Sequence, residues 1–155
     1  MLNILLLLLA LAATPQIDAF KKEASGLQSA IDQIVNNSIP GPGMLQKAKA
    51  TYLEGFGVVV TVEVALEPPP NPFSNPKSPE ELRRVVNQRS GLIRSKFQDL
   101  VKQRIVTLQS VGPTESLAVV LHLFNPHPAA LPAMPGQIVF TAKKQDPSNV
   151  AIREY

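Results

Sequence analysis

The chain has 155 residues, no cysteine and a formal net charge of +3. The lack of cysteine excludes a disulfide framework, a thiolate metal site and a cysteine nucleophile, and the small charge, with no tryptophan and only two tyrosines, argues against a nucleic-acid binder. Fifteen prolines, about double the usual share, indicate stiff connections between a few regular elements.

The first residues predict export. Leu2 to Ala13 are apolar except for Asn3, and this run has the length of a signal-peptide core, whereas a membrane-spanning helix takes about 20 residues. We expect residues 1–14 to be a signal peptide, cleaved between positions 12 and 19, and residues 16–155 to form a single α+β domain. No lysine or arginine precedes the run, which indicates either a weak signal or a true start that lies upstream. Two alternatives stay open: a retained leader that tethers the chain to a membrane, and a buried helix start in a cytosolic protein.

An amphipathic helix is predicted directly after Pro15. Its apolar residues recur at alternating spacings of three and four, and Asn36, Asn37 and the Pro40–Gly43 run end it. The predicted buried stripe consists of Ile17, Phe20, Ala24, Leu27, Ile31 and Ile34.

The clearest strand runs from Val58 to Glu67, where apolar and polar residues alternate. Glu63 and Glu67 lie on its polar side, so we expect both to be solvated. Thr51–Phe56 is also predicted to be extended, and Gly55 and Gly57 predict a tight bend before the main strand.

A proline-rich segment, Pro68 to Pro76, separates this strand from a long helix. We interpret the segment as a stiff connector, with a polyproline ligand for an SH3-type groove as the alternative. The helix begins with an N-cap at Ser78, proline at the first helical position and Glu81 as in a capping box, and it is expected to run to about Leu108.

Three further strands are predicted beyond Gly112-Pro113. Leu117–Phe124 is apolar in both alternations, which favours a central strand covered on both faces, with His122 as a hydrogen-bonded core residue. A proline-rich loop, Asn125–Gly136, leads to a strand at Gln137–Lys143. The sequence Asp146 to Asn149 predicts a turn, and Val150–Tyr155 a short edge strand.

This order of elements predicts an α+β fold: a mixed four- to five-stranded sheet with the long helix and the N-terminal amphipathic helix packed on one face. If the two strands that flank the long helix are neighbours, they are expected to be parallel, and the later strands should add antiparallel pairs.

Little in the sequence indicates catalysis. His122 and His127 have no acidic residue close in sequence to complete a set of three metal ligands, and no serine has the glycines of a nucleophile elbow. We therefore predict no catalytic residue, no metal site and no cofactor.

Four segments form a pattern of their own: Tyr52 to Val64 (YLEGFGVVVTVEV), Pro72-Phe73-Ser74, Leu131-Pro132 with Gln137-Ile138-Val139, and the terminal Arg153-Glu154-Tyr155. In this pattern the chain resembles an uncharacterised family of small secreted acidobacterial proteins. The resemblance implies a location in the bacterial envelope, and it brings no activity and no catalytic residue.

The leading hypothesis is a non-catalytic, exported interaction module, either periplasmic or extracellular. Its expected partner is an envelope protein or a second copy of the chain; nucleic acid is not expected, and membrane contact only through an uncleaved leader. Two alternatives stay open: a small-ligand or lipid-binding domain with its site between the long helix and the sheet, and a hydrolase-like enzyme with a dispersed site around His122 and His127. The candidate interaction residues are Phe56, Phe73, His127 and Tyr155, beside the edge strand at Val150–Tyr155.

Overall fold

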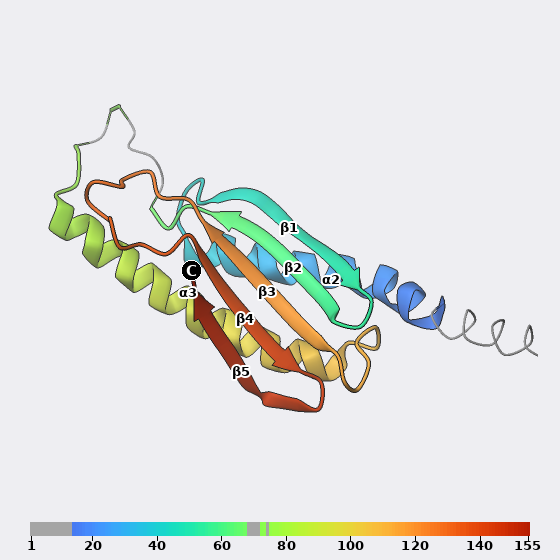
Figure 1. Cartoon of the computed structure of the whole chain (residues 1–155). Helices are drawn as coiled ribbons and strands as arrows, with labels where there is room; N and C mark the ends of the chain where they lie inside the picture. The colour runs from blue at the N-terminus through green and yellow to red at the C-terminus, as the bar shows by residue number, and fades with distance from the viewer. Residues whose placement is uncertain (1–13, 68–71, 74) are drawn as a thin grey trace, which may run out of the picture.

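The computed structural model describes residues 14–67, 72–73 and 75–155. Most of the proline-rich segment, Pro68–Asn71 and Ser74, and the predicted signal peptide up to residue 13 lie outside these described residues. The described elements, in chain order, are α2 (Thr14–Ser38), β1 (Met44–Leu53), β2 (Gly57–Val64), α3 (Pro79–Thr107), β3 (Ser116–Leu123), β4 (Gln137–Lys143) and β5 (Asp146–Glu154) (Figure 1).

The five strands form one mixed sheet in the order β1-β2-β3-β4-β5. β2 and β3, which flank α3 in the chain, pair in parallel from Gly57 with Ser116 to Val64 with Leu123. The other three neighbouring pairs are antiparallel. The predicted α+β fold and the parallel pairing across the long helix are both confirmed.

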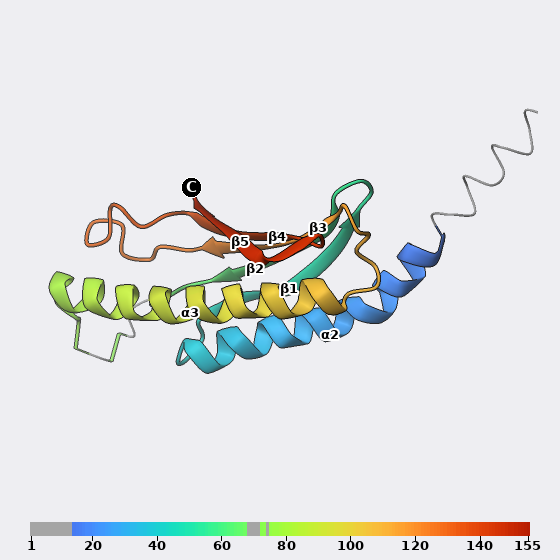
Figure 2. The ribbon, with the colours of Figure 1, turned by 90° about the horizontal axis from the view of Figure 1, so that it is seen from below.

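Both helices lie on the same side of the sheet, as expected (Figure 2). α2 packs mainly against β1, and α3 packs against β3, β4 and β5. No helix of the described residues covers the opposite side, which we call the helix-free face (Figure 2). The expectation that β3 is covered on both faces is therefore wrong: its second alternation, with Ala118 and Val120, lies on the helix-free face, flanked by β2 and β4.

The core lies between the sheet and the two helices, and alternation in the strands builds it. Val58, Val60, Val62 and Val64 of β2 are at most 2% exposed. From the helix side, Phe97 of α3 stacks on Phe140 of β4, with 5.6 Å between ring centroids. Burying such side chains contributes roughly 25 cal/mol per Å² of apolar surface, so this interface is the main source of stability.

α2 confirms the predicted N-terminal helix, with one exception in its stripe. Leu27 and Ile31 are buried, but Ile17 is 43% exposed. Ile17 is the fourth residue of α2, and the first turns of this helix extend beyond the sheet (Figure 2).

α3 begins as predicted. Ser78 is the N-cap, and its hydroxyl accepts a hydrogen bond from the Glu81 N–H at 3.2 Å, with Pro79 at the first position. The helix ends at Thr107 with Leu108 as its C-cap, as the sequence indicates.

Three strands have bounds that differ from prediction. β1 begins at Met44 and ends at Leu53, before Phe56, because Glu54–Phe56 form the turn into β2. β2 ends at Val64, so Glu67 is not a strand residue. Glu67 is buried and forms ion pairs with Lys77 and Arg89. The expectation that Glu67 is solvated is therefore wrong. The last turn falls at Lys144-Gln145 rather than at Asp146–Asn149. The edge strand β5 therefore starts at Asp146, four residues earlier than predicted.

Candidate functional site

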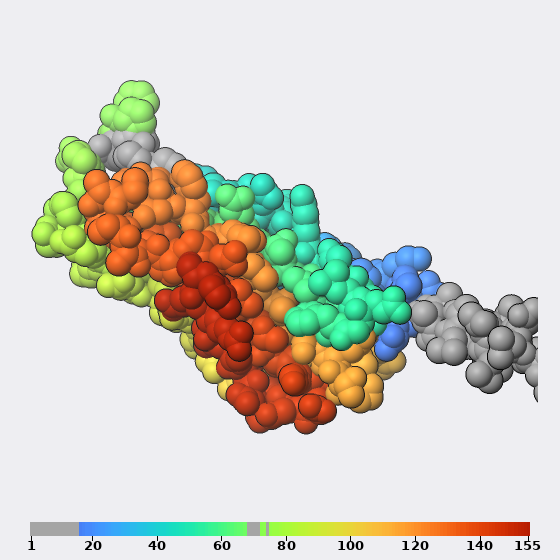
Figure 3. Space-filling model, in the orientation of Figure 1, coloured from blue at the N-terminus to red at the C-terminus, as the bar shows by residue number. Residues whose placement is uncertain are grey.

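The helix-free face carries the outward side chains of the strands, and its centre is apolar. Val59, Val120 and Val139 lie there half-buried, one on each of three adjacent strands. Lys49 of β1, Lys143 of β4 and Arg153 of β5 surround this centre. Figure 3 views the molecule from this side, with β5 in dark red and the β1–β2 turn in teal.

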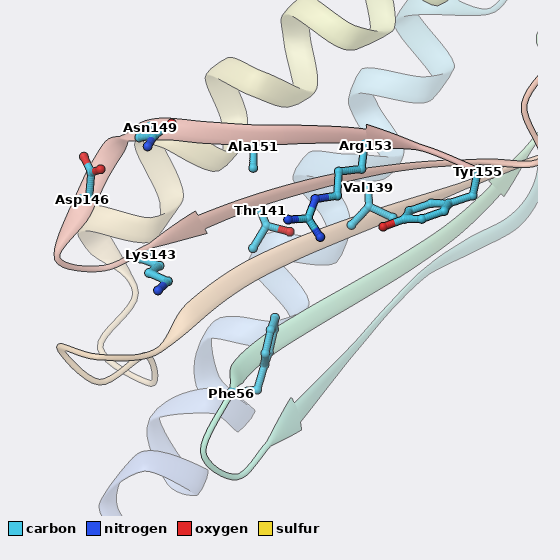
Figure 4. A pocket seen from close by; sticks show the side chains of 9 residues that line it. All are labelled: Phe56, Val139, Thr141, Lys143, Asp146, Asn149, Ala151, Arg153 and Tyr155. Atoms are coloured by element: carbon cyan, nitrogen blue, oxygen red, sulfur yellow. The ribbon is translucent and has the colours of Figure 1, made fainter.

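A hollow of about 360 Å³ opens on this face above β4 and β5. Figure 4 shows the Tyr155 ring pointing along the strands toward Val139 and Arg153, while Phe56 faces them from across the hollow. We call this the sheet-face hollow; it is lined by Phe56, Val139, Thr141, Lys143, Asp146, Asn149, Ala151, Arg153 and Tyr155.

Local backbone bonds hold the two aromatic residues in place. Phe56 lies in the β1–β2 turn, where its carbonyl accepts from the Ser116 N–H at 2.7 Å. The turn needs glycine at Gly57, because its φ is +115° and a side chain there would collide with the Ser116 carbonyl. Tyr155 and Gln137 exchange backbone hydrogen bonds of 3.1 Å in each direction, which fixes Tyr155 beside β4.

The side chains that line the hollow carry one more positive charge than negative. Among its lining residues Lys143 and Arg153 face one acid, Asp146. Within the described part of the chain, Arg153 makes no ion pair. A guanidinium that is exposed and unpaired can donate two parallel hydrogen bonds to a carboxylate.

The structure brings together two of the four predicted interaction residues. Phe56 is 38% exposed and Tyr155 66% exposed, and both line the sheet-face hollow. Phe73, at 96% exposure, lies before α3 and does not line it. His127 lies half-buried in the loop after β3, where its backbone N–H donates a hydrogen bond to Asn125 Oδ1.

His122 is not the hydrogen-bonded core residue that its apolar neighbours predict. It is half-buried on the helix-free face, in register with Glu63 of β2, and it lines a shallow depression with Lys47 and Thr61. No hydrogen bond to its side chain is found among the described residues. The misassignment has a physical cause: in the alternation of β3, His122 shares a side with Ala118 and Val120, and that side has no second layer.

The described residues bring no set of metal-ligating side chains together. Across residues 14–67, 72–73 and 75–155, no three histidine, aspartate or glutamate side chains are grouped to hold a metal ion. Among the described residues, two groups have shifted pKa values, and both lie on the helix side of the sheet in hydrogen bonds between elements.

Glu23 of α2 is the first of these groups. Burial acts to raise the pKa of Glu23, but hydrogen bonds from the Ser110 hydroxyl and from the N–H groups of Gln109 and Ser110, with the charge of Lys144, lower it overall. The second is Tyr52 of β1: burial and its 2.7 Å hydrogen bond to Glu115 raise the pKa of Tyr52 to about 12.

Sequence reasoning missed Arg153 and Thr141 as site residues. The signal was present in the strand alternation, since Arg153, Ala151 and Tyr155 share one side of the last strand. What the sequence did not reveal was that this side faces away from both helices.

Comparison of the chain with protein-family models, curated proteins and solved structures finds no match. The resemblance to secreted acidobacterial proteins therefore stays a prediction. Among the described helices, none has a stretch both long and apolar enough to span a bilayer.

Proposed function

We propose that this protein is a non-catalytic, exported interaction module that binds an extended segment of a partner protein along the outer edge of β5. The observation that carries this proposal is the sheet-face hollow, where two exposed aromatic side chains and an unpaired arginine lie beside an edge strand. The apolar run of residues 2–13 supports its export.

The hydrogen-bond pattern of β5 supports docking at its edge. Because Tyr155 and Gln137 exchange two backbone bonds, alternation places Arg153 and Ala151 in the next bonded pairs with β4. The N–H and C=O groups of Ile152 and Glu154 consequently point outward, away from β4. They are available to a sixth strand, as in recognition by strand addition.

Such a strand would place alternate side chains over the helix-free face. An added strand lies about 4.8 Å from β5, within reach of Arg153 and Tyr155. Backbone bonds would supply affinity, and the hollow would select the side chains. We expect the preferred segment to carry an acidic residue next to an apolar or aromatic one.

The proposal can be tested by selecting peptides from a displayed library on the folded protein. Selected peptides should be enriched in Asp or Glu beside apolar residues, and Arg153→Ala should weaken their binding about tenfold, as expected for a lost charge-assisted bond. Arg84→Ala is the matched control, because Arg84 is exposed on α3, away from the hollow.

A second variant tests the edge itself. Ile152→Pro removes an outward N–H while leaving the bonds to β4, and it should abolish binding with little loss of stability, since edge strands tolerate proline. Peptides that bind this variant and Arg153→Ala as tightly as the unmodified protein would contradict the proposal, as would a library that yields no binder.

A further inference from the structure

A second, larger hollow lies on the other side of β5. It measures about 430 Å³ and is enclosed by the first half of α3, the loop between β3 and β4, and the end of β5. Figures 1 and 2 both show this loop, in orange, lying over the green half of α3. We call it the helix–loop cavity; its apolar wall includes Leu66, Val86, Leu123, Leu131, Pro132 and Met134.

The loop that forms the wall is held in shape by its own hydrogen bonds. Asn125 donates from Nδ2 to the Leu131 carbonyl at 2.8 Å and accepts from the His127 N–H at 2.9 Å. The His127 carbonyl accepts from the Ala130 and Leu131 N–H groups. Prolines restrict the same loop further. The cavity is therefore preformed, as small-molecule sites usually are, and its volume lies within their usual range of about 300–1,000 Å³.

The polar rim of the cavity is cationic on balance. Its charged lining residues are Arg83, Arg94 and Glu154, two positive charges against one negative. Arg94 already has partners: it forms an ion pair with Glu154, and its Nε donates a hydrogen bond to the Ser90 hydroxyl.

Arg83 is held only weakly. It pairs with Glu80, whose side chain is 79% exposed, and its bond to the Ala130 carbonyl is long, at 3.4 Å. Exposed ion pairs of this kind contribute little stability, so Arg83 can reorient toward a ligand at low cost.

We propose that the helix–loop cavity binds a medium-chain fatty acid, with its alkyl chain against Leu66, Leu131 and Met134 and its carboxylate on Arg83. An apolar cavity with one available guanidinium at its rim matches an amphiphile with a single anionic head. This site is distinct from the sheet-face hollow, so it does not depend on the strand-docking proposal.

Head-group comparison tests the proposal in the purified full chain. Decanoate, decanol and decyltrimethylammonium share one alkyl chain and differ in charge. By isothermal titration below micelle concentrations, decanoate should bind with saturation at one site, decanol more weakly and the ammonium most weakly. Arg83→Gln should weaken decanoate about tenfold, the size expected for a lost bond to a charged group, and leave decanol unchanged.

A blocking variant tests the location. Asn87 lines the cavity from an exposed position on α3, so Asn87→Trp should fill its mouth and abolish binding. Gln88 is also exposed on α3 but does not line the cavity, so Gln88→Trp should bind decanoate normally.

Methionine methyl NMR gives a readout that does not depend on either tryptophan variant. Decanoate should shift the Met134 methyl signal and leave that of Met44, which packs against the core at the start of β1, unchanged. Absence of decanoate binding, equal affinity for all three head groups, or unaltered binding by Arg83→Gln or Asn87→Trp would each overturn the proposal.

Discussion

The carboxylate of Glu23 joins α2 to the segment between α3 and β3, and its removal has a calculable consequence. Oε1 accepts from the Gln109 N–H at 2.7 Å, and Oε2 accepts from the Ser110 N–H at 3.0 Å and from the Ser110 hydroxyl at 2.6 Å. Ser110 is fully buried, so no water replaces a lost partner. Glu23→Gln keeps one acceptor oxygen but turns an amide NH₂ toward an N–H donor.

The expected loss follows from these contacts. A hydrogen bond to a charged group contributes about 1.5–3 kcal/mol, and a buried donor left unpaired costs about 1–3 kcal/mol. Because Glu23 is itself partly exposed, we expect Glu23→Gln to lower the free energy of unfolding at neutral pH by about 2 kcal/mol, toward the lower part of that range.

The effect of pH has a definite sign. Folding lowers the pKa of Glu23 below its usual 4.5, so the ionised carboxylate stabilises the fold above that pH, and the contribution is lost as pH falls through the folded-state pKa. The difference in stability between the unmodified protein and Glu23→Gln should therefore be full at neutral pH and shrink under acid conditions.

Urea unfolding, followed by circular dichroism from neutral pH down to about pH 3, measures this difference. Asp99→Asn is the control, because Asp99 is exposed on α3 and makes no hydrogen bond or ion pair within the described residues; it should change stability by less than about 0.5 kcal/mol. If the Glu23→Gln difference stayed constant across the pH range, the assigned role of the carboxylate would be refuted.

Three further predictions concern the core and the buried polar contacts. Phe97→Ala should cost about 3–5 kcal/mol, since it empties the stack on Phe140, and a urea midpoint unchanged from the unmodified protein would contradict the packing. Glu67→Ala should cost about 3 kcal/mol by leaving Arg89 largely buried without its partner; calorimetry showing an unchanged Tm would exclude this role. Tyr52→Phe should lower the free energy of unfolding at neutral pH, because it removes the hydrogen bond to Glu115. Folding raises the pKa of Tyr52 to about 12, so in urea titrations the difference in stability between this variant and the unmodified protein should shrink as pH rises from 10 toward 12. A difference independent of pH would contradict the hydrogen bond to Glu115.

The elements with strong local signals were predictable from the sequence. The cap at Ser78 depends on a contact between residues close in the chain, and the alternation of valines in β2 is a pattern of neighbouring residues that the sequence displays directly. β1 was recognised only in its last residues, because an edge strand with half its side chains in water has lysines where a central strand has valines.

Burial on the second face of the sheet was not predictable in the same way. Val120 and Ala118 make β3 apolar on both alternations, yet only one alternation meets a helix. Likewise, Glu67 lies beyond the end of β2, where Arg89 reaches it from α3, and sequence spacing does not reveal such a contact.

The candidate site was predictable in part. Exposed aromatic residues in turns and at chain ends are recognisable, which is how Phe56 and Tyr155 were found. Their meeting above β4 and β5 depends on the strand order and on the face each residue occupies. Both follow from tertiary pairing, so the site as a unit became visible only in the fold.

The parallel pairing of β2 with β3 also affects how the chain acquires its structure. β1 and β2 pair across a short turn, and β3, β4 and β5 pair in the order in which they occur in the chain. The second neighbour of β2 is β3, which follows α3 in the chain. During synthesis, the valine-rich inner edge of β2 therefore stays unpaired until residue 123 has been made. We expect this pairing, with its large loop-closure entropy, to limit the folding rate and to be the stage at which the chain is most prone to aggregate.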